Sequence, residues 1–227
     1  MSDSVKADKL FDPYEFTGVL MPGAILLVGL VQLVPGLGSL IAVKDITVGG
    51  LGLFVILADV AGHLVQSLGG MIEFLWWRPF GWPTARILKP DQRLLSKGQR
   101  SDLEQQVHSK LALKDPFRIA DLTPQEWSPI TRQIYVAVAA ASRSSRVDAF
   151  NGIYGLSRGL AAAFFVLAVV TLIQNRANWL YALGLVLAAA LSLYRMREFG
   201  FRYATELFVQ FLQLPMSDSA SETKPIT

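Results

Sequence analysis

Four long stretches with almost no charge constrain the fold of this chain more than any other feature. No charged residue occurs over 16–43, 159–175 or 177–194, and Asp59 is the only one over 46–60. A helix needs about 20 apolar residues to cross a hydrocarbon core about 30 Å thick. We therefore predict an all-α polytopic membrane protein with four transmembrane helices, a small helical cytosolic region and a C-terminal amphipathic helix.

The predicted spans pair into two hairpins. Residues 1–77 form the first, with spans near 16–34 and 46–77, and residues 149–196 form the second, with spans near 151–174 and 179–194. Pro22 is expected to kink the first span, since proline lacks a backbone donor. Pro35 to Gly38 break that span, and Lys44 with Asp45 forms a short polar turn. We expect the first span to be retained, because no small-residue cleavage site follows its apolar run.

The region 78–148 is the only sizeable polar part of the chain, and it is expected to be helical. Two matches to the capping box, Ser101 to Glu104 and Thr123 to Glu126, predict helices over about 102–113 and 124–145. Within the second helix, one apolar stripe follows the helical period: Ile130, Ile134 and Val138.

The C-terminal part is predicted to leave the membrane. Residues 197–215 have apolar side chains on one helical face, which predicts an amphipathic helix on the membrane surface or against the polar region. Residues 216–227 are polar and rich in Ser and Thr, and they are expected to be a disordered tail.

The distribution of charge predicts the orientation. The region 78–148 holds twelve Lys and Arg against seven Asp and Glu, whereas the two short turns hold only Lys44 and Arg176. Basic residues collect in cytoplasmic loops. We therefore expect a multi-pass membrane protein with residues 78–148 and both termini in the cytoplasm.

One polar stripe marks the second predicted span. Asp59, His63, Gln66 and Glu73 fall within about 80° of one another at 100° per residue. A charge at the centre of a membrane helix costs about 2.5–3.5 kcal/mol on insertion scales. Either these side chains line a pore or a proton path, or they form a structural polar seam with a neighbouring helix.

Small residues also repeat at intervals of four on three spans, which favours close helix packing. The three sets are Ala58 and Gly62; Gly155, Gly159 and Ala163; and Gly184, Ala188 and Ser192.

Basic residues cluster at the start of the polar region, and they are the candidates for binding an anionic ligand such as a nucleotide. The candidates are Arg86, Lys89, Arg93, Lys97 and Arg100. Lys and Arg can bind phosphates, and neighbouring aromatic residues can stack on bases. The alternative is that these charges only set topology and contact anionic lipid.

Enzymatic chemistry is not expected. The chain has no cysteine and two histidines, so we predict no catalytic residue, no cofactor and no metal site within one chain. Motifs of metalloproteases, of serine hydrolases and of P-loop proteins do not occur in it.

Two segments resemble small multi-pass membrane effectors of bacterial anti-phage defence systems, such as the Hailong type. They are residues 11–23, FDPYEFTGVLMPG, and residues 58–73, ADVAGHLVQSLGGMIE. In such systems a nucleotidyltransferase makes a nucleotide or oligonucleotide signal, and the effector opens or disrupts the inner membrane. The resemblance implies an oligomeric channel, a ligand of short nucleic acid or nucleotide, and a soluble signalling partner.

The sequence thus predicts a homo-oligomeric inner-membrane effector or ion channel, gated by a nucleotide or oligonucleotide on the cytosolic side. A proton-coupled small transporter and a membrane anchor for a soluble partner are the alternatives. Ion flux separates the channel from the anchor, and substrate-coupled uptake identifies the transporter.

Overall fold

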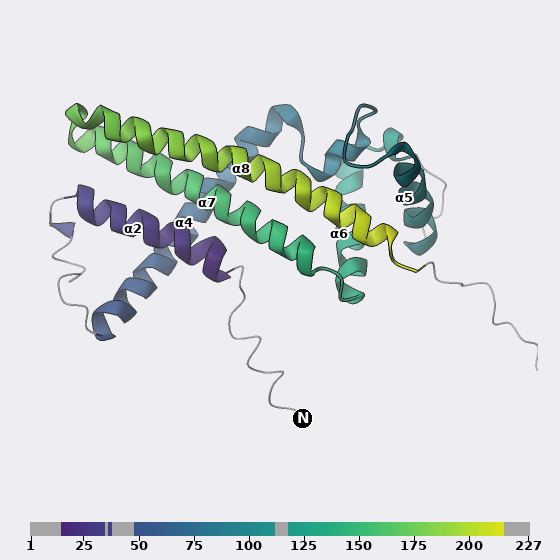
Figure 1. Ribbon diagram of the computed structural model, residues 1–227, viewed down its shortest axis with the longest axis horizontal. Coiled ribbons are helices and arrows are strands. Elements are labelled where there is room, and N and C mark those ends of the chain that lie inside the picture. Colours follow the sequence, from purple (N-terminus) through teal and green to yellow (C-terminus); the bar gives the residue numbers. More distant parts are fainter. Residues whose placement is uncertain (1–14, 35, 38–47, 112–117, 216–227) are drawn as a thin grey trace, which may run out of the picture. The chain divides into compact units, whose positions relative to one another are not determined.

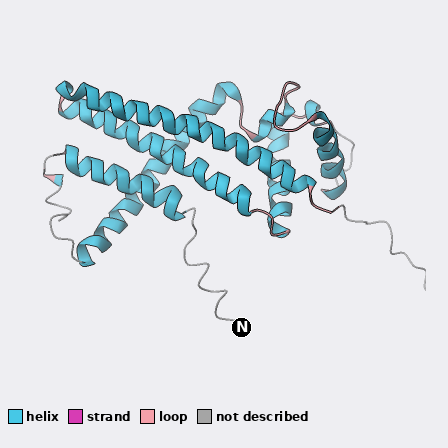
Figure 2. Ribbon diagram, in the orientation of Figure 1, coloured by secondary structure: helices cyan, strands magenta, loops and turns pink. Residues whose placement is uncertain are grey.

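A computed structural model describes residues 15–34, 36–37, 48–111 and 118–215. Helices joined by short loops make up these residues, which confirms the all-α prediction (Figure 2). The predicted polar turn at Lys44 and Asp45 and the predicted tail over 216–227 lie outside the described residues.

Six α-helices are described: α2 (Met21–Leu33), α4 (Val48–Phe80), α5 (Lys97–Lys110), α6 (Pro124–Ala140), α7 (Ser145–Gln174) and α8 (Trp179–Leu212) (Figure 1). A π-helical turn and three 3-10 turns accompany them: η1 (Glu15–Leu20), η2 (Thr84–Leu88), η3 (Ile119–Asp121) and η4 (Arg176–Asn178). The chain divides into two compact units, which we call the span unit (Met1–Phe80 with Ala149–Gly200) and the core unit (Gly81–Asp148 with Phe201–Thr227). Helices α7 and α8 contribute residues to both units.

Three described helical stretches are long and apolar enough to cross a membrane. They are Gly50–Leu88, Ser145–Gln174 and Arg176–Leu212, which include most of α4, all of α7 and all of α8. Large apolar side chains cover their surfaces, such as Ile56 and Leu64 on α4 and Leu187 on α8. These lengths and compositions identify a multi-pass membrane protein. The first predicted span corresponds to a shorter apolar helix, Thr17–Leu33.

Helices α2 and α4 cross with their backbones in contact. A Cβ atom added to Gly23 would overlap with the carbonyl oxygen of Ala58 and with the backbone of Gly62. Gly62 in turn lies against the backbone of Val19. The small-residue pattern at Ala58 and Gly62 therefore does mark a close crossing. Pro22 lies in the first turn of α2, where its missing donor is tolerated, so the chain changes there from η1 to α2.

Of the other two small-residue patterns, the one on α7 lies at a close helix contact and the one on α8 does not. A Cβ atom on Gly159 would meet Pro22 Cγ and Gln66 Nε2 at 2.8 Å, so this face of α7 packs closely. Gly184 on α8 is exposed, and no described atom lies within 4 Å of a Cβ atom placed there.

The core unit has its own apolar interior. Trp127, Ile134 and Val138 of α6 are fully buried, and Ile130 packs against them, which confirms the predicted stripe. Trp127 also lies against Phe208, with ring centroids 5.9 Å apart, and donates its Nε1–H to the carbonyl of Thr84 at 2.9 Å.

One of the two predicted helix starts in this unit is right and one is wrong. Thr123 and Glu126 form the predicted capping box, and α6 begins at Pro124. Helix α5 begins at Lys97, because Ser96 and Gln99 form a capping box one turn before the predicted one. The Glu104 carboxylate is used elsewhere and accepts the backbone N–H of Ile119 at 2.9 Å.

Two predicted helix ends also need correction. Helix α6 ends at Ala140 rather than near 145, since the chain turns at Ser142, which has a positive φ of 56°. The fourth predicted span and the predicted amphipathic helix form one continuous helix, α8. Its last part buries Ala204, Leu207 and Phe211 in the core unit, so the predicted packing against the polar region is observed.

Candidate functional site

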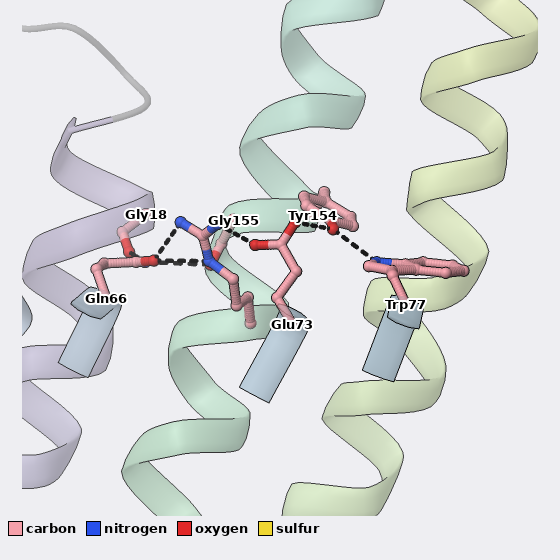
Figure 3. A network of polar contacts seen from close by, with 7 residues as sticks. Gly18, Gln66, Glu73, Trp77, Tyr154 and Gly155 are labelled. Atoms are coloured by element: carbon pink, nitrogen blue, oxygen red, sulfur yellow. Dashed lines mark hydrogen bonds and ion pairs between the residues drawn. The ribbon is translucent and has the colours of Figure 1, made fainter. Parts of the chain in front are cut away.

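A chain of polar contacts joins α4 to α7 inside the span unit (Figure 3). Trp77 donates its Nε1–H to the Tyr154 hydroxyl at 2.9 Å, and that hydroxyl donates to Glu73. Arg158 forms an ion pair with the other oxygen of Glu73 through Nη1. We call Gln66, Glu73, Trp77, Tyr154 and Arg158 the polar network.

Gln66 extends the polar network to a third helical segment. The Gln66 side-chain oxygen accepts Nε–H and Nη2–H of Arg158 at 3.1 and 2.8 Å. Its Nε2 donates to the carbonyl of Gly155 at 3.1 Å and to the carbonyl of Gly18 in η1. Arg158 thus bridges two positions of α4, and Gln66 ties η1, α4 and α7 together.

The network is largely buried, and its side chains are hydrogen-bonded to one another. The Glu73 side chain is 9% exposed and the Arg158 side chain 21%. Each donor or acceptor named above has a partner, which is what a buried polar group needs to avoid a desolvation penalty of about 1–3 kcal/mol. Because both charges are paired and enclosed, this arrangement fits a structural seam that fixes the helix positions.

Asp59 and His63 have a different environment on the same helix. Asp59 Oδ2 lies 3.8 Å from His63 Nε2, and the two side chains are 55% and 70% exposed. They flank the middle of the apolar part of α4, and exposed apolar residues, Ile56, Val60 and Leu64, surround them. The pair therefore points away from the rest of the described span unit.

The predicted stripe of four residues is thus divided along its length. At 100° per residue, Gln66 and Glu73 lie on one side of Asp59 and His63 lies on the other. The first edge faces α7 and is paired, whereas the second edge faces outward. Gln66 and Glu73 are therefore paired with Arg158 of α7, whereas Asp59 and His63 are exposed.

The candidates for anionic ligands all lie in the core unit, on η2, on α5 and between them. Lys89, Arg93 and Lys97 are exposed, and none forms an ion pair with a described residue. Arg86 and Arg100 are half-buried. The Arg100 Nη2 lies 3.5 Å from the carbonyl of Leu88, and its buried Nε has no hydrogen-bond partner among the described residues.

Possible metal ligands are sparse in the described part of the chain. In the described part of the chain, no three His, Cys, Asp or Glu side chains come together. Asp59 with His63 is the closest approach to such a set on α4.

Sequence reasoning missed Tyr154 and Arg158 as members of the network. Arg158 is the last charge before the apolar run that begins at Gly159, and Glu73 is the last acidic residue of the apolar part of α4. Isolated opposite charges on two spans were the available signal, since ionisable residues inside membranes tend to pair with one another.

Comparisons with protein-family models, with curated proteins and with solved structures found no match to this chain.

Proposed function

We propose that the protein is a homo-oligomeric ion channel in which the exposed edges of α4 from several copies line the conducting path. The observation that carries this proposal is the exposure of Asp59 and His63 in the middle of an apolar helix. In a lone chain this edge would face lipid.

The energetics favour a polar partner for this edge. A charged Asp at the centre of a membrane helix costs about 2.5–3.5 kcal/mol on insertion scales. His63 offers Asp59 only a partial contact at 3.8 Å, and both side chains remain more than half exposed. A water-filled path along α4, or a second copy packed on it, removes the cost by supplying hydrogen bonds.

The polar network supports the same assignment from the neighbouring edge of the stripe on α4. It holds α4 against α7 and η1, so the exposed edge has a fixed direction. A conducting path needs such fixed lining groups. The paired charges of Glu73 and Arg158 are not available to line it.

We assign the fourth crossing to the stretch Thr17–Leu33. At 1.5 Å per residue its 17 residues reach about 25 Å, a little less than the hydrocarbon core. Its close crossing with α4 at Gly23 and Gly62 gives it a protein partner within that depth. Four crossings place both termini on the same side as the core unit.

The signal that opens the channel is proposed to be a nucleotide or oligonucleotide, as in the membrane effectors of anti-phage defence. Lys89, Arg93 and Lys97 support this part, since they project from one short segment of the core unit without ionic partners in the described chain. Binding should weaken with salt, with a log–log slope of about −0.7 per phosphate contact for single strands. Salt-insensitive or absent binding of short oligonucleotides and cyclic nucleotides would remove the sensor from the proposal.

Ion flux from liposomes that contain the purified protein tests the channel itself. Asp59→Asn and His63→Gln are expected to change flux at equal protein content, because both replace lining groups with neutral side chains of similar size. Asp91→Asn and His108→Gln are the matched controls, since both residues lie in the core unit. Flux that needs a co-transported substrate would indicate the proton-coupled transporter, and absent flux would leave the membrane anchor.

A further inference from the structure

Asp59 and His63 bring two potential metal-binding atoms close together. Asp59 Oδ2 and His63 Nε2 lie 3.8 Å apart, one helical turn from each other on the same edge of α4. Zinc binds imidazole nitrogen and carboxylate oxygen at about 2.0–2.2 Å. Two such donors at a tetrahedral angle lie about 3.4 Å apart. A small side-chain adjustment would therefore let both groups bind one ion.

The described residues of one chain do not complete this site. Zinc takes four ligands in structural sites, and no third His, Cys, Asp or Glu lies near the pair in the described residues. We infer that Asp59 and His63 from two neighbouring copies bind one Zn²⁺ or a similar divalent transition-metal ion. This inference rests on the proposed function, in which the α4 edges of several copies meet.

The surface around the pair permits a second copy to approach. Gly52 and Gly70 lie within about 20° of Asp59 around α4, and no described atom lies within 4 Å of a Cβ atom placed on either. Small residues on both sides of a polar group let two helix backbones come close. The Ser67 hydroxyl donates to the His63 carbonyl at 3.0 Å, so it does not occupy the imidazole.

Charge balance favours a divalent ion at this site, and the ligand type favours a transition metal. Two Asp carboxylates and two neutral imidazoles around a divalent cation give a site with no net charge, which lowers the cost of placing it among apolar residues. Imidazole favours Zn²⁺, Ni²⁺ or Cu²⁺, whereas Ca²⁺ and Mg²⁺ need six or more oxygen ligands. A bound ion would join two copies in the conducting path and thereby block flux.

Titration of Zn²⁺ into tag-free, full-length protein in detergent tests the inference. Few other side chains can compete for Zn²⁺, because the chain contains two histidines and no cysteine. We expect saturable binding of one Zn²⁺ per two chains by calorimetry, and intense tetrahedral absorption when Co²⁺ replaces it. His63→Gln and Asp59→Asn should each weaken binding by at least about tenfold, since even the loss of an outer-shell group costs that much. His108→Gln should bind as the wild type does.

The controls separate this inference from the proposed function. Circular dichroism should show the same helix content in all variants, because both replaced side chains are exposed. Binding that is absent, or that survives His63→Gln, would overturn the metal site even if the protein is oligomeric and conducts ions. One Zn²⁺ per monomeric chain would overturn it too. The oligomeric state measured with EDTA present tests the proposed function independently.

Discussion

Replacement of Arg158 by methionine should destabilise the span unit strongly. The change keeps much of the side-chain volume but leaves the buried Glu73 carboxylate with Tyr154 as its described partner. Gln66 would keep both of its Nε2 contacts, but its side-chain oxygen would lose both donors from Arg158. Removal of one partner of a buried ion pair costs about 3–5 kcal/mol. That corresponds to a factor of more than about 100 in the folding equilibrium.

The double variant Glu73→Gln with Arg158→Met gives the decisive comparison. It removes both charges, so it should be more stable than Arg158→Met alone, since no charge is then left unpaired. Arg78→Met is the matched control, because Arg78 is an exposed residue of the same helix α4. An exposed substitution of this type changes stability by no more than about 0.5 kcal/mol.

Unfolding in detergent micelles by added SDS, followed by circular dichroism, gives the free energies for this comparison. Two results would refute the account of the polar network. One is a loss in Arg158→Met no larger than that in Arg78→Met. The other is strict additivity of the losses from Glu73→Gln and Arg158→Met, which would mean that the two side chains are not coupled.

Three further predictions concern the crossing, the topology and one helix cap. Gly62→Val should destabilise the protein by about 1–3 kcal/mol in the same SDS titration, because its side chain would overlap with Val19, whereas Gly184→Val should cost far less. Single cysteines at positions 2 and 105 should be shielded from an impermeant reagent in intact cells while one at 178 reacts; labelling of position 2 would show that Thr17–Leu33 does not cross. Bonds from the Thr123 backbone N–H and hydroxyl lower the pKa of Glu126, so their stabilisation exists above the pKa of the unfolded chain and is lost as the pH falls through the lower folded pKa. Glu126→Gln should therefore lower the melting temperature at neutral pH and lose that effect in acid, and a pH-independent difference would contradict this.

Local sequence signals predicted the features that depend on local interactions. The apolar run ending at Gln174 gave the end of α7, and Thr123 with Glu126 gave the start of α6. The predicted start of α5 was wrong because the helix begins at the preceding capping box, Ser96 with Gln99, and a Ser-x-x-Glu pattern such as Ser101 to Glu104 also fits a helix interior.

The division of the polar stripe could not be predicted in the same way. Periodicity places Asp59, His63, Gln66 and Glu73 on one side of α4, but it does not say which edge a neighbouring helix covers. That choice depends on contacts between residues more than 80 positions apart, such as Glu73 with Arg158 and Gln66 with Gly155.

Disulfide formation between copies tests the central claim, that the α4 edge with Asp59 and His63 faces another copy. Ser67 lies one turn beyond His63 on this edge and is exposed, and the chain has no native cysteine. In oxidised membranes Ser67→Cys should give covalent dimers, whereas Leu187→Cys on the exposed apolar surface of α8 should not. Dimers from Leu187→Cys alone, or from neither variant, would contradict the account.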